Sequence, residues 1–483
     1  MRKRYRKKGV ITIFSAISFA LTVSLFLSLL ESARLQGMRY FYPEYVNLQS
    51  DNILAHYDLD IYEKFGVFGR YNDGNIEETL NEYLNRDESL DERDLLKGKS
   101  ANVTDISFKL MTDDEGKAFQ HLAASYMKAV FPDVFSDKVN EFISNFSEVS
   151  EYMDGNKLME HIDSAIDAVL KAISIAESKL YKTYIDADGN EVTTEDPEMR
   201  AAIDRLKGCG ILEAKKQVEE FSILSLLPQG AMVSKGRKLQ YDPIEKRELK
   251  SGDMEPVSTD RIEYYLTILY AGSTLRSFLD SNAQTSDGEE PKQNNEGLVY
   301  ELEYLLAGKD TDEENLSYAA KRVYVLRSAV RFLANLMDPT KVDTAYGLAV
   351  MLVGFTGLPF LIPLVKLGIL ICWSLVDAIA DCRMLFSGIR LPLIPFGVCA
   401  AVQLNYPEHI LFTLVPKGTK ILSYRIMDMI EESAGKKMDD MVIALKGTAE
   451  VYTDLKIAKA LLMVPIPNIR LHDNYEYYSK YYR

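Results

Sequence analysis

The chain has 483 residues, of which 47% are apolar and 26% charged, and its formal net charge is −15 at pH 7. This ordinary globular composition excludes a wholly disordered, collagen-like or low-complexity protein. Six of the 56 basic residues lie in the first eight positions, and all 71 acidic residues lie at or after Glu31. So acidic a body repels polyanions, and we expect no nucleic-acid partner.

The first element in chain order is a charge-free stretch at residues 9–30. It is 22 residues long, and about 20 apolar helical residues cross a bilayer. Six cations precede it and Glu31 follows it. The positive-inside rule therefore predicts a single-pass protein of the cell membrane, with residues 1–8 in the cytoplasm and the body outside.

A cleaved secretory signal is the alternative to this anchor. Such a signal has an apolar region of about 7–15 residues that ends in a small-x-small cleavage site. The stretch here is longer, and a leucine stands at the −3 position of a cut after Ser32. We therefore favour a retained transmembrane anchor.

Residues 31–70 form a juxtamembrane segment that is predicted to be helical. Glu31 and Arg34 are three residues apart, so they can pair on one helix face just outside the membrane. Pro43 is expected to end the first helical piece. An apolar face on residues 45–65 predicts a second helix after it.

Residues 71–258 are predicted to be a helical region with minor β structure. Alternation at residues 101–110 indicates a strand, and strand formers around an Asp-Gly-Asn turn predict a hairpin near residues 183–194. The turn, Asp186 to Asn190, also imitates the start of a calcium loop. Its glycine is in the fourth place rather than the sixth, and Pro197 stands where the bidentate glutamate belongs. A plain hairpin turn is therefore favoured over a calcium site.

Residues 259–460 are predicted to be an α-helical core domain, with a long amphipathic helix at residues 311–337. A second charge-free stretch, residues 344–365, is also 22 residues long. Its glycines and prolines are expected to break the helix near Gly357. The prediction is a buried helix–break–helix core in which Trp373, the only tryptophan, is a core residue. Membrane contact by this stretch is the alternative.

The helix after the break carries Ser374, Asp377 and Asp381 on one face. Either carboxylate would cost a few kcal/mol in lipid. Inside a helical core, the carboxylates could instead be paired with arginines of the preceding long helix. The candidates there are Arg322, Arg327 and Arg331.

The tail at residues 461–483 is rich in tyrosine. We expect an ordinary terminal tail that packs on the body. Docking of a partner or of the cell wall by these tyrosines is the less favoured alternative.

Catalytic motifs are not found in the sequence. It contains no phosphate-binding loop, zincin motif or nucleophile elbow, and its four cysteines and five histidines have no metal spacing. Glu301, Glu303, Asp377 and Asp381 could serve as acid–base carboxylates, but no nucleophile accompanies them. A structural ion network is therefore favoured, with no catalytic, cofactor-binding or metal-binding residue.

Two segments resemble known families. Residues 8–14 (Lys-Gly-Val-Ile-Thr-Ile-Phe), with the exit from Glu31 to Arg34, resemble the N-termini of tight-adherence (Tad) pilus assembly proteins of the TadE/TadG kind. Residues 300–310 (Tyr-Glu-Leu-Glu-Tyr-Leu-Leu-Ala-Gly-Lys-Asp) also look familiar. With Asn315 and the Asp-Cys-Arg of residues 381–383, they resemble an uncharacterised Gram-positive membrane-anchored family found with tight-adherence pilus loci.

The resemblance implies a non-catalytic, surface-exposed accessory or assembly component of a tight-adherence pilus or type II-like export system. Its partners would be the membrane and other proteins of that machinery. Processed pseudopilins carry Glu at the fifth position after the glycine, where this chain has Phe14, so cleavage after Gly9 is not expected. The alternative is a membrane-anchored extracellular enzyme or ligand-binding sensor, for which Glu303, Asp377, Asp381 and an arginine would have to form the pocket.

The predicted fold is therefore mainly α, with one N-terminal transmembrane helix and a helical ectodomain that carries a minor β-hairpin. The expected segments are the lead (1–8), the anchor (9–30), a pseudopilin-like juxtamembrane segment (31–70), a helical region (71–258), the core domain (259–460) and the tail (461–483).

Overall fold

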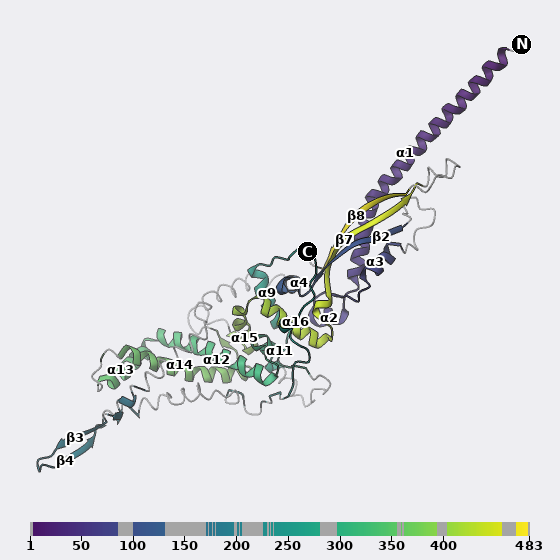
Figure 1. Cartoon of the computed structure of the whole chain (residues 1–483). Helices are drawn as coiled ribbons and strands as arrows, with labels where there is room; N and C mark the ends of the chain where they lie inside the picture. The colour runs from purple at the N-terminus through teal and green to yellow at the C-terminus, as the bar shows by residue number, and fades with distance from the viewer. Residues whose placement is uncertain are drawn as a thin grey trace. The chain divides into compact units, whose positions relative to one another are not determined.

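The computed structural model of the chain places helices and a few small sheets in two compact units (Figure 1). It describes residues 3–85, 100–130, 236–280, 297–354, 362–393, 403–455 and 470–481. It also describes Pro359 and parts of the stretch between residues 171 and 234. The predicted helical content of residues 131–170 and 205–225 lies outside the described residues. Across the described residues helices predominate, which confirms the mainly α fold class.

The two units interleave along the chain. The first, here called the sheet unit, comprises Met1–Tyr126, Glu248–Thr259 and Ala434–Arg483. The second, the helical unit, comprises Met127–Arg247 and Asp260–Ser433. The boundaries expected from sequence followed chain order, and they differ from these because the last strands of the chain pair with a strand near its beginning.

One long helix, α1 (Lys3–Ala55), opens the sheet unit. Residues 11–30 are almost entirely exposed, with Phe14 and Phe19 each 72% accessible, and this half projects from the unit (Figure 1). Among the described residues, α1 is the one helix long and apolar enough to cross a membrane.

The predicted helix end at Pro43 is wrong, because α1 runs through it. A proline inside a helix removes one backbone hydrogen bond and costs about 3 kcal/mol. The neighbouring Tyr42 and Val46 are buried in the core that α1 forms with the sheet. Burial of these side chains offsets the lost bond, so packing holds the helix continuous.

The sheet has four antiparallel strands around β7 (Met441–Asp454), which pairs with all three others. These are β1 (Arg70–Tyr71), β2 (Ser100–Leu110) and β8 (Arg470–Lys480). The strand β2 confirms the predicted strand at residues 101–110. The described part of the Tyr-rich tail is the strand β8, so it packs on the body, as expected.

The sheet unit also contains the helices α2 and α3 and most of α4 (Lys117–Val130). The helix α2 (Leu59–Phe65) ends at Gly66, whose φ of +66° is left-handed and whose space Tyr126 closes against any larger residue. The helix α3 (Ile76–Asn85) packs with α1 over the sheet. The core of the unit is a cluster of apolar side chains from these elements that includes Val46, Ile53, Ile76, Leu80, Val442, Leu445 and Ala449.

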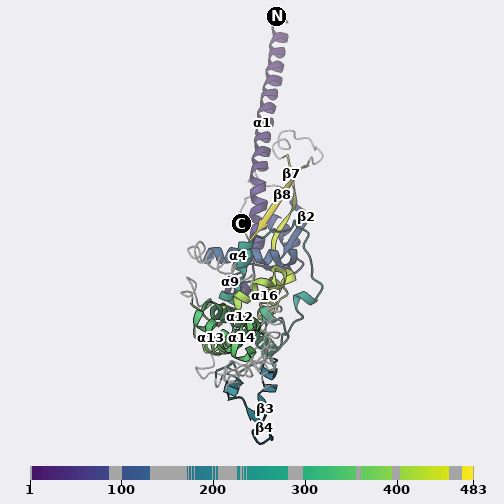
Figure 2. The ribbon, with the colours of Figure 1, turned by 90° about the vertical axis from the view of Figure 1, so that its left-hand side faces the viewer.

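The helical unit centres on α12 (Asp312–Met337), α13 (Pro339–Gly354) and α14 (Ile362–Phe386). Here α14 packs against both of the others, and Figure 2 shows the three together. The predicted helix at residues 311–337 is confirmed, with Thr311 as its N-cap. The other long or well-formed helices of the unit are α9 (Arg261–Thr274), α11 (Glu301–Ala307), α15 (Tyr406–Leu414) and α16 (Thr419–Ala434).

Short strand pairs also belong to the helical unit. The predicted hairpin is confirmed as β3 (Tyr181–Ile185) and β4 (Glu191–Glu195). Asp186 Oδ1 accepts the backbone N–H groups of Asp188 and Asn190, both at 2.9 Å, as a plain turn requires. A second pair, β5 (Leu391–Pro392) with β6 (Gln403–Leu404), lies after α14.

The second charge-free stretch is broken, as predicted, because α13 ends at Gly354 and α14 begins at Ile362. Its expected burial is only half right. On one face of α13, Ala345, Ala349 and Val353 are fully buried, whereas Tyr346 on the other face is 53% exposed. The helix lies at the edge of its bundle, so it packs by one face only.

Candidate functional site

A buried ion pair lies directly after the apolar stretch of α1. Arg34 Nη2 donates to Glu31 Oε1 at 2.7 Å and to the backbone carbonyl of Asp454, the last residue of β7, at 2.6 Å. Both side chains are less than 10% exposed. The predicted i,i+3 pairing is therefore confirmed, and it fastens α1 to the end of the central strand. Glu31 directly follows the exposed apolar stretch of residues 11–30.

The carboxylates singled out in the sequence do not converge on one another. Asp381 lies between two guanidinium groups, because Arg327 Nη2 donates to it at 2.6 Å and Arg331 Nε at 2.7 Å. Arg327 and Asp381 are fully buried, and Arg327 also donates to the carbonyl of Pro392 at 2.7 Å. Two of the three predicted arginine partners are correct. The third, Arg322, bonds the Tyr318 hydroxyl instead.

Glu301 and Glu303 each hold a backbone group of the segment after α9. Glu301 Oε2 accepts the N–H of Arg276 at 2.7 Å, and Glu303 Oε1 accepts the N–H of Phe278 at 3.0 Å. Burial raises the pKa of Glu301 to about 6 and that of Glu303 to about 7. These carboxylates therefore serve as fixed acceptors for loop backbone.

His409 is buried beside the Asp381 cluster. Its Nδ1 lies 2.7 Å from the carbonyl of Asn405, so Nδ1 carries the proton. Burial, together with the Arg327 charge, lowers its pKa to about 4. The histidine is thus neutral at physiological pH, and it adds no positive charge to a cluster that already holds two arginines.

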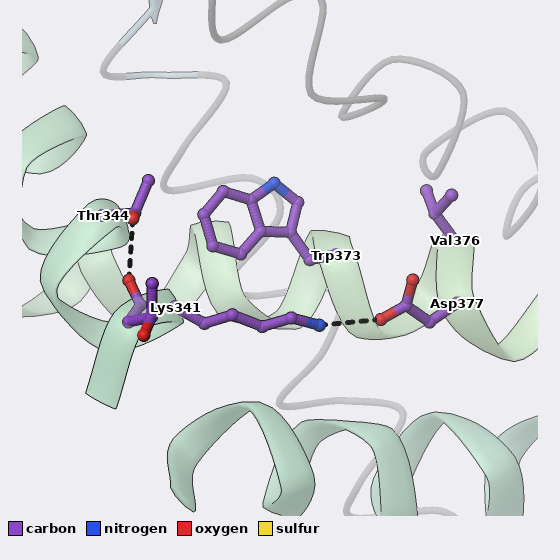
Figure 3. A pocket seen from close by; sticks show the side chains of 6 residues that line it. Lys341, Thr344, Trp373, Val376 and Asp377 are labelled. Carbon is purple, nitrogen blue, oxygen red and sulfur yellow. Dashed lines mark hydrogen bonds and ion pairs between the residues drawn. The ribbon is translucent and has the colours of Figure 1, made fainter. Parts of the chain in front are cut away.

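An open pocket of about 310 Å³ lies between the first turns of α13 and the middle of α14 (Figure 3). Trp373 of α14 is half-buried at this pocket, so the prediction of a core tryptophan is wrong. The cause is the edge position of α13, which covers only part of α14. The other lining residues are Thr340, Lys341, Thr344, Val376 and Asp377.

A chain of polar side chains connects this pocket to the helical interior. Lys341 Nζ donates to Asp377 Oδ2 at 3.2 Å and to Asn335 Oδ1 at 2.6 Å. Asn335 Nδ2 then donates to Ser374 Oγ at 2.9 Å. Asn335 and Ser374 are 2% and 1% exposed, so the network fixes the Lys341 ammonium from beneath.

Sequence reasoning named Ser374 and Asp377 but missed Lys341 and Asn335 as their partners. The available signal was a polar side chain on a buried face of each of two facing helices. Asparagine and serine are costly in an apolar interior unless they bond to each other. Such a pair of polar residues predicts a contact between the two helices, here the hydrogen bond from Asn335 to Ser374.

A second open pocket, of about 540 Å³, lies in the sheet unit beside α2. Lys436 pairs with Asp58. Burial raises the pKa of Asp58 and the bond with Lys436 lowers it, and the net shift of the pKa is downward. Tyr83 Oη lies 3.0 Å from His56 Nε2, and Arg70 donates to the carbonyl of Ile53 at 2.8 Å. Most of these groups are engaged in holding α1, α2 and α3 together.

Among the described residues, no group of three or more histidine, cysteine, aspartate or glutamate side chains lies close enough to hold a metal ion.

One protein family matches part of the chain in sequence. Residues 205–395, less than half of the chain, match a family of unknown function (DUF5702). This range includes α9 and runs through α14 to β5, so it contains both the Asp381 cluster and the Trp373 pocket. No curated protein and no solved structure matches the chain significantly. Over residues 205–395, the protein is therefore similar to a family whose function is unknown.

Proposed function

We propose that the protein is a membrane-anchored, surface-exposed accessory or assembly component of a tight-adherence pilus or type II-like export system, and that it is non-catalytic. The resemblance of residues 8–34 to TadE/TadG-type N-termini, and of residues 300–310 to a family found with such loci, motivates this proposal. The described structure adds a physical argument to it.

The observation that carries the proposal is the division of α1. Its apolar half is exposed along residues 11–30, and its second half supplies core residues such as Val46 and Ile53 to the sheet unit. One continuous helix therefore joins an apolar, membrane-length rod to a folded body without a flexible linker. A component of this kind transmits position and force between a bilayer and an extracellular assembly.

The orientation and processing follow from the N-terminal residues. Six cations before the apolar stretch favour a cytoplasmic N-terminus. Filament subunits of the pilin type use a glutamate at the fifth position after the cut to pair with a neighbouring amine, and Phe14 cannot accept such a pairing. We therefore expect an uncut chain that stays in the membrane as an accessory component.

A non-catalytic role is supported by the fate of the candidate carboxylates. Asp381 is neutralised by two arginines and Asp377 by Lys341, whereas Glu301 and Glu303 each accept a backbone N–H. An acid–base pair needs two carboxyl groups that share one reactive space. In the described residues these four side chains have separate partners instead.

The test is co-purification of a C-terminally tagged full chain from detergent-solubilised native membranes. We expect other proteins of the pilus or export machinery to be recovered with it. A matched variant, in which a polyleucine helix replaces residues 9–30, should remain in the membrane, and its partners should be retained if the body binds them. Recovery of no such protein with either form would contradict the proposal.

A further inference from the structure

The Trp373 pocket has features that helix packing alone does not explain. Trp373 is the only tryptophan of the chain, and it lies half-buried at an opening between α13 and α14. Figure 3 shows the Lys341 side chain running alongside the indole to the Asp377 carboxylate. Large aromatic rings at concave openings are typical of binding sites rather than of solvent-facing helix surfaces.

The polar groups beside the indole are held in place before any ligand arrives. Lys341 and Asp377 are each about 40% exposed, so both can still contact a ligand. Asn335 fixes the ammonium from the buried side, and Ser374 fixes Asn335. Groups whose positions are set by such a supporting network lose little entropy on binding.

We propose that this pocket binds a neutral pyranose-type glycan. The face of an indole carries partial negative charge, and it attracts the weakly positive C–H groups of a sugar ring. Lys341 supplies donors, Asp377 supplies acceptors, and the Thr340 hydroxyl can do either. A sugar with many hydroxyl groups can use all three at once.

The two charges also favour a neutral ligand. Lys341 Nζ and Asp377 Oδ2 lie 3.2 Å apart and compensate each other, so the pair has no net charge to attract a simple anion or cation. A cavity of about 310 Å³ is at the lower end of small-molecule sites, and it accommodates one or two sugar rings. Glycan binding goes beyond the assembly role proposed above, and it does not depend on that role.

Trp373 makes the test direct, because its emission is the only tryptophan signal of the full chain. The detergent-solubilised protein is titrated with β-1,4-linked N-acetylglucosamine tetramer and, separately, with cellotetraose. We expect a saturable shift of the emission with at least one of the two oligomers, at a Kd of about 1 mM or below. Absence of a saturable shift with both up to about 10 mM would overturn the proposal.

Two variants separate a glycan site from a structural role, with affinity measured by calorimetry. Asp377→Asn keeps the shape of the side chain but removes its charge, and it should weaken binding at least about fivefold. Tyr346→Ser changes an exposed residue of α13 outside the pocket, and it should leave the affinity unchanged. Equal affinities of both variants and the unaltered chain would place the glycan elsewhere and refute this site. The proposed assembly role would be unaffected by that result.

Discussion

Two stretches of the chain, residues 9–30 and 344–365, are both charge-free and 22 residues long, yet they form different structures. The first is part of one unbroken helix that is exposed along its apolar half. The second is divided into α13 and the start of α14, and α13 buries a face of small and branched residues against its neighbours. Length and apolarity alone therefore do not decide whether such a stretch forms one exposed helix or a broken, partly buried one. Internal glycines and prolines, and the presence of helices that can cover one face, decide the outcome.

The largest effect should come from the ion cluster that holds α14 against α12. Asp381→Ala leaves Arg327 buried without its carboxylate, and removal of one partner from a buried pair costs about 3–5 kcal/mol. Chemical denaturation of the full chain in detergent, followed by Trp373 emission, measures this loss. Asp377→Asn, at a half-exposed pair, is the control, and it should cost less than about 1 kcal/mol. Equal losses in the two variants would contradict the burial difference.

A matched pair of substitutions tests which face of α13 is packed. Val353→Asp places a carboxylate at a fully buried position, and it should destabilise the helical unit by more than about 2 kcal/mol. Val350→Asp, on the face where valine is 37% exposed, should change the stability by less than about 0.5 kcal/mol. If both variants lost the same amount of stability, the two faces of α13 would be equally covered, and the comparison would fail.

The stability of the helical unit should depend on pH through a buried carboxyl group. The pKa of Glu303 is raised by burial from 4.5 to about 7, so the folded unit holds this proton more tightly than the unfolded chain. Its favourable contribution is therefore complete below about pH 4.5 and is lost as the pH rises towards 7. Glu303→Gln should raise the stability at pH 8 by about 1–3 kcal/mol and flatten the change in melting temperature between pH 5 and pH 8. A steeper pH dependence in the variant would contradict the raised pKa.

The smallest effect on stability is expected from the substitution of a glycine within residues 344–365. Gly347 lies inside α13, and no atom lies within 4 Å of the position that an added Cβ would occupy. Gly347→Ala should therefore stabilise the helical unit by about 0.5–1 kcal/mol through helix propensity alone. Thermal unfolding measures the gain. A loss of stability would show that the open side of α13 is occupied.

Local patterns predicted many of the elements. The long helix α12, the strand β2, the hairpin of β3 and β4, and the pairing of Glu31 with Arg34 depend on residues close in sequence. Capping, alternation and turn chemistry act over a few residues, so a single sequence reveals them.

The features that were missed depend on contacts between distant segments. Pro43 stays within α1 because strands from the end of the chain help to bury its neighbours, and Trp373 faces a pocket because α13 lies at a bundle edge. The interleaved units have the same origin, since β7 pairs with a strand more than 300 positions earlier. The candidate site was only half visible, because Asp377 could be named while its partner Lys341 could not.

The most direct test of the account is membrane partition of two forms of the chain. Full-length protein and a form that begins at Gln36, which lacks residues 9–30 but keeps the second stretch, are expressed and extracted at high pH. We predict that the full chain remains with the membranes and that the shorter form is recovered in the soluble fraction without detergent. If the shorter form partitioned into membranes as firmly as the full chain, residues 344–365 would themselves be a membrane element, and the assignment of a single anchor would be wrong.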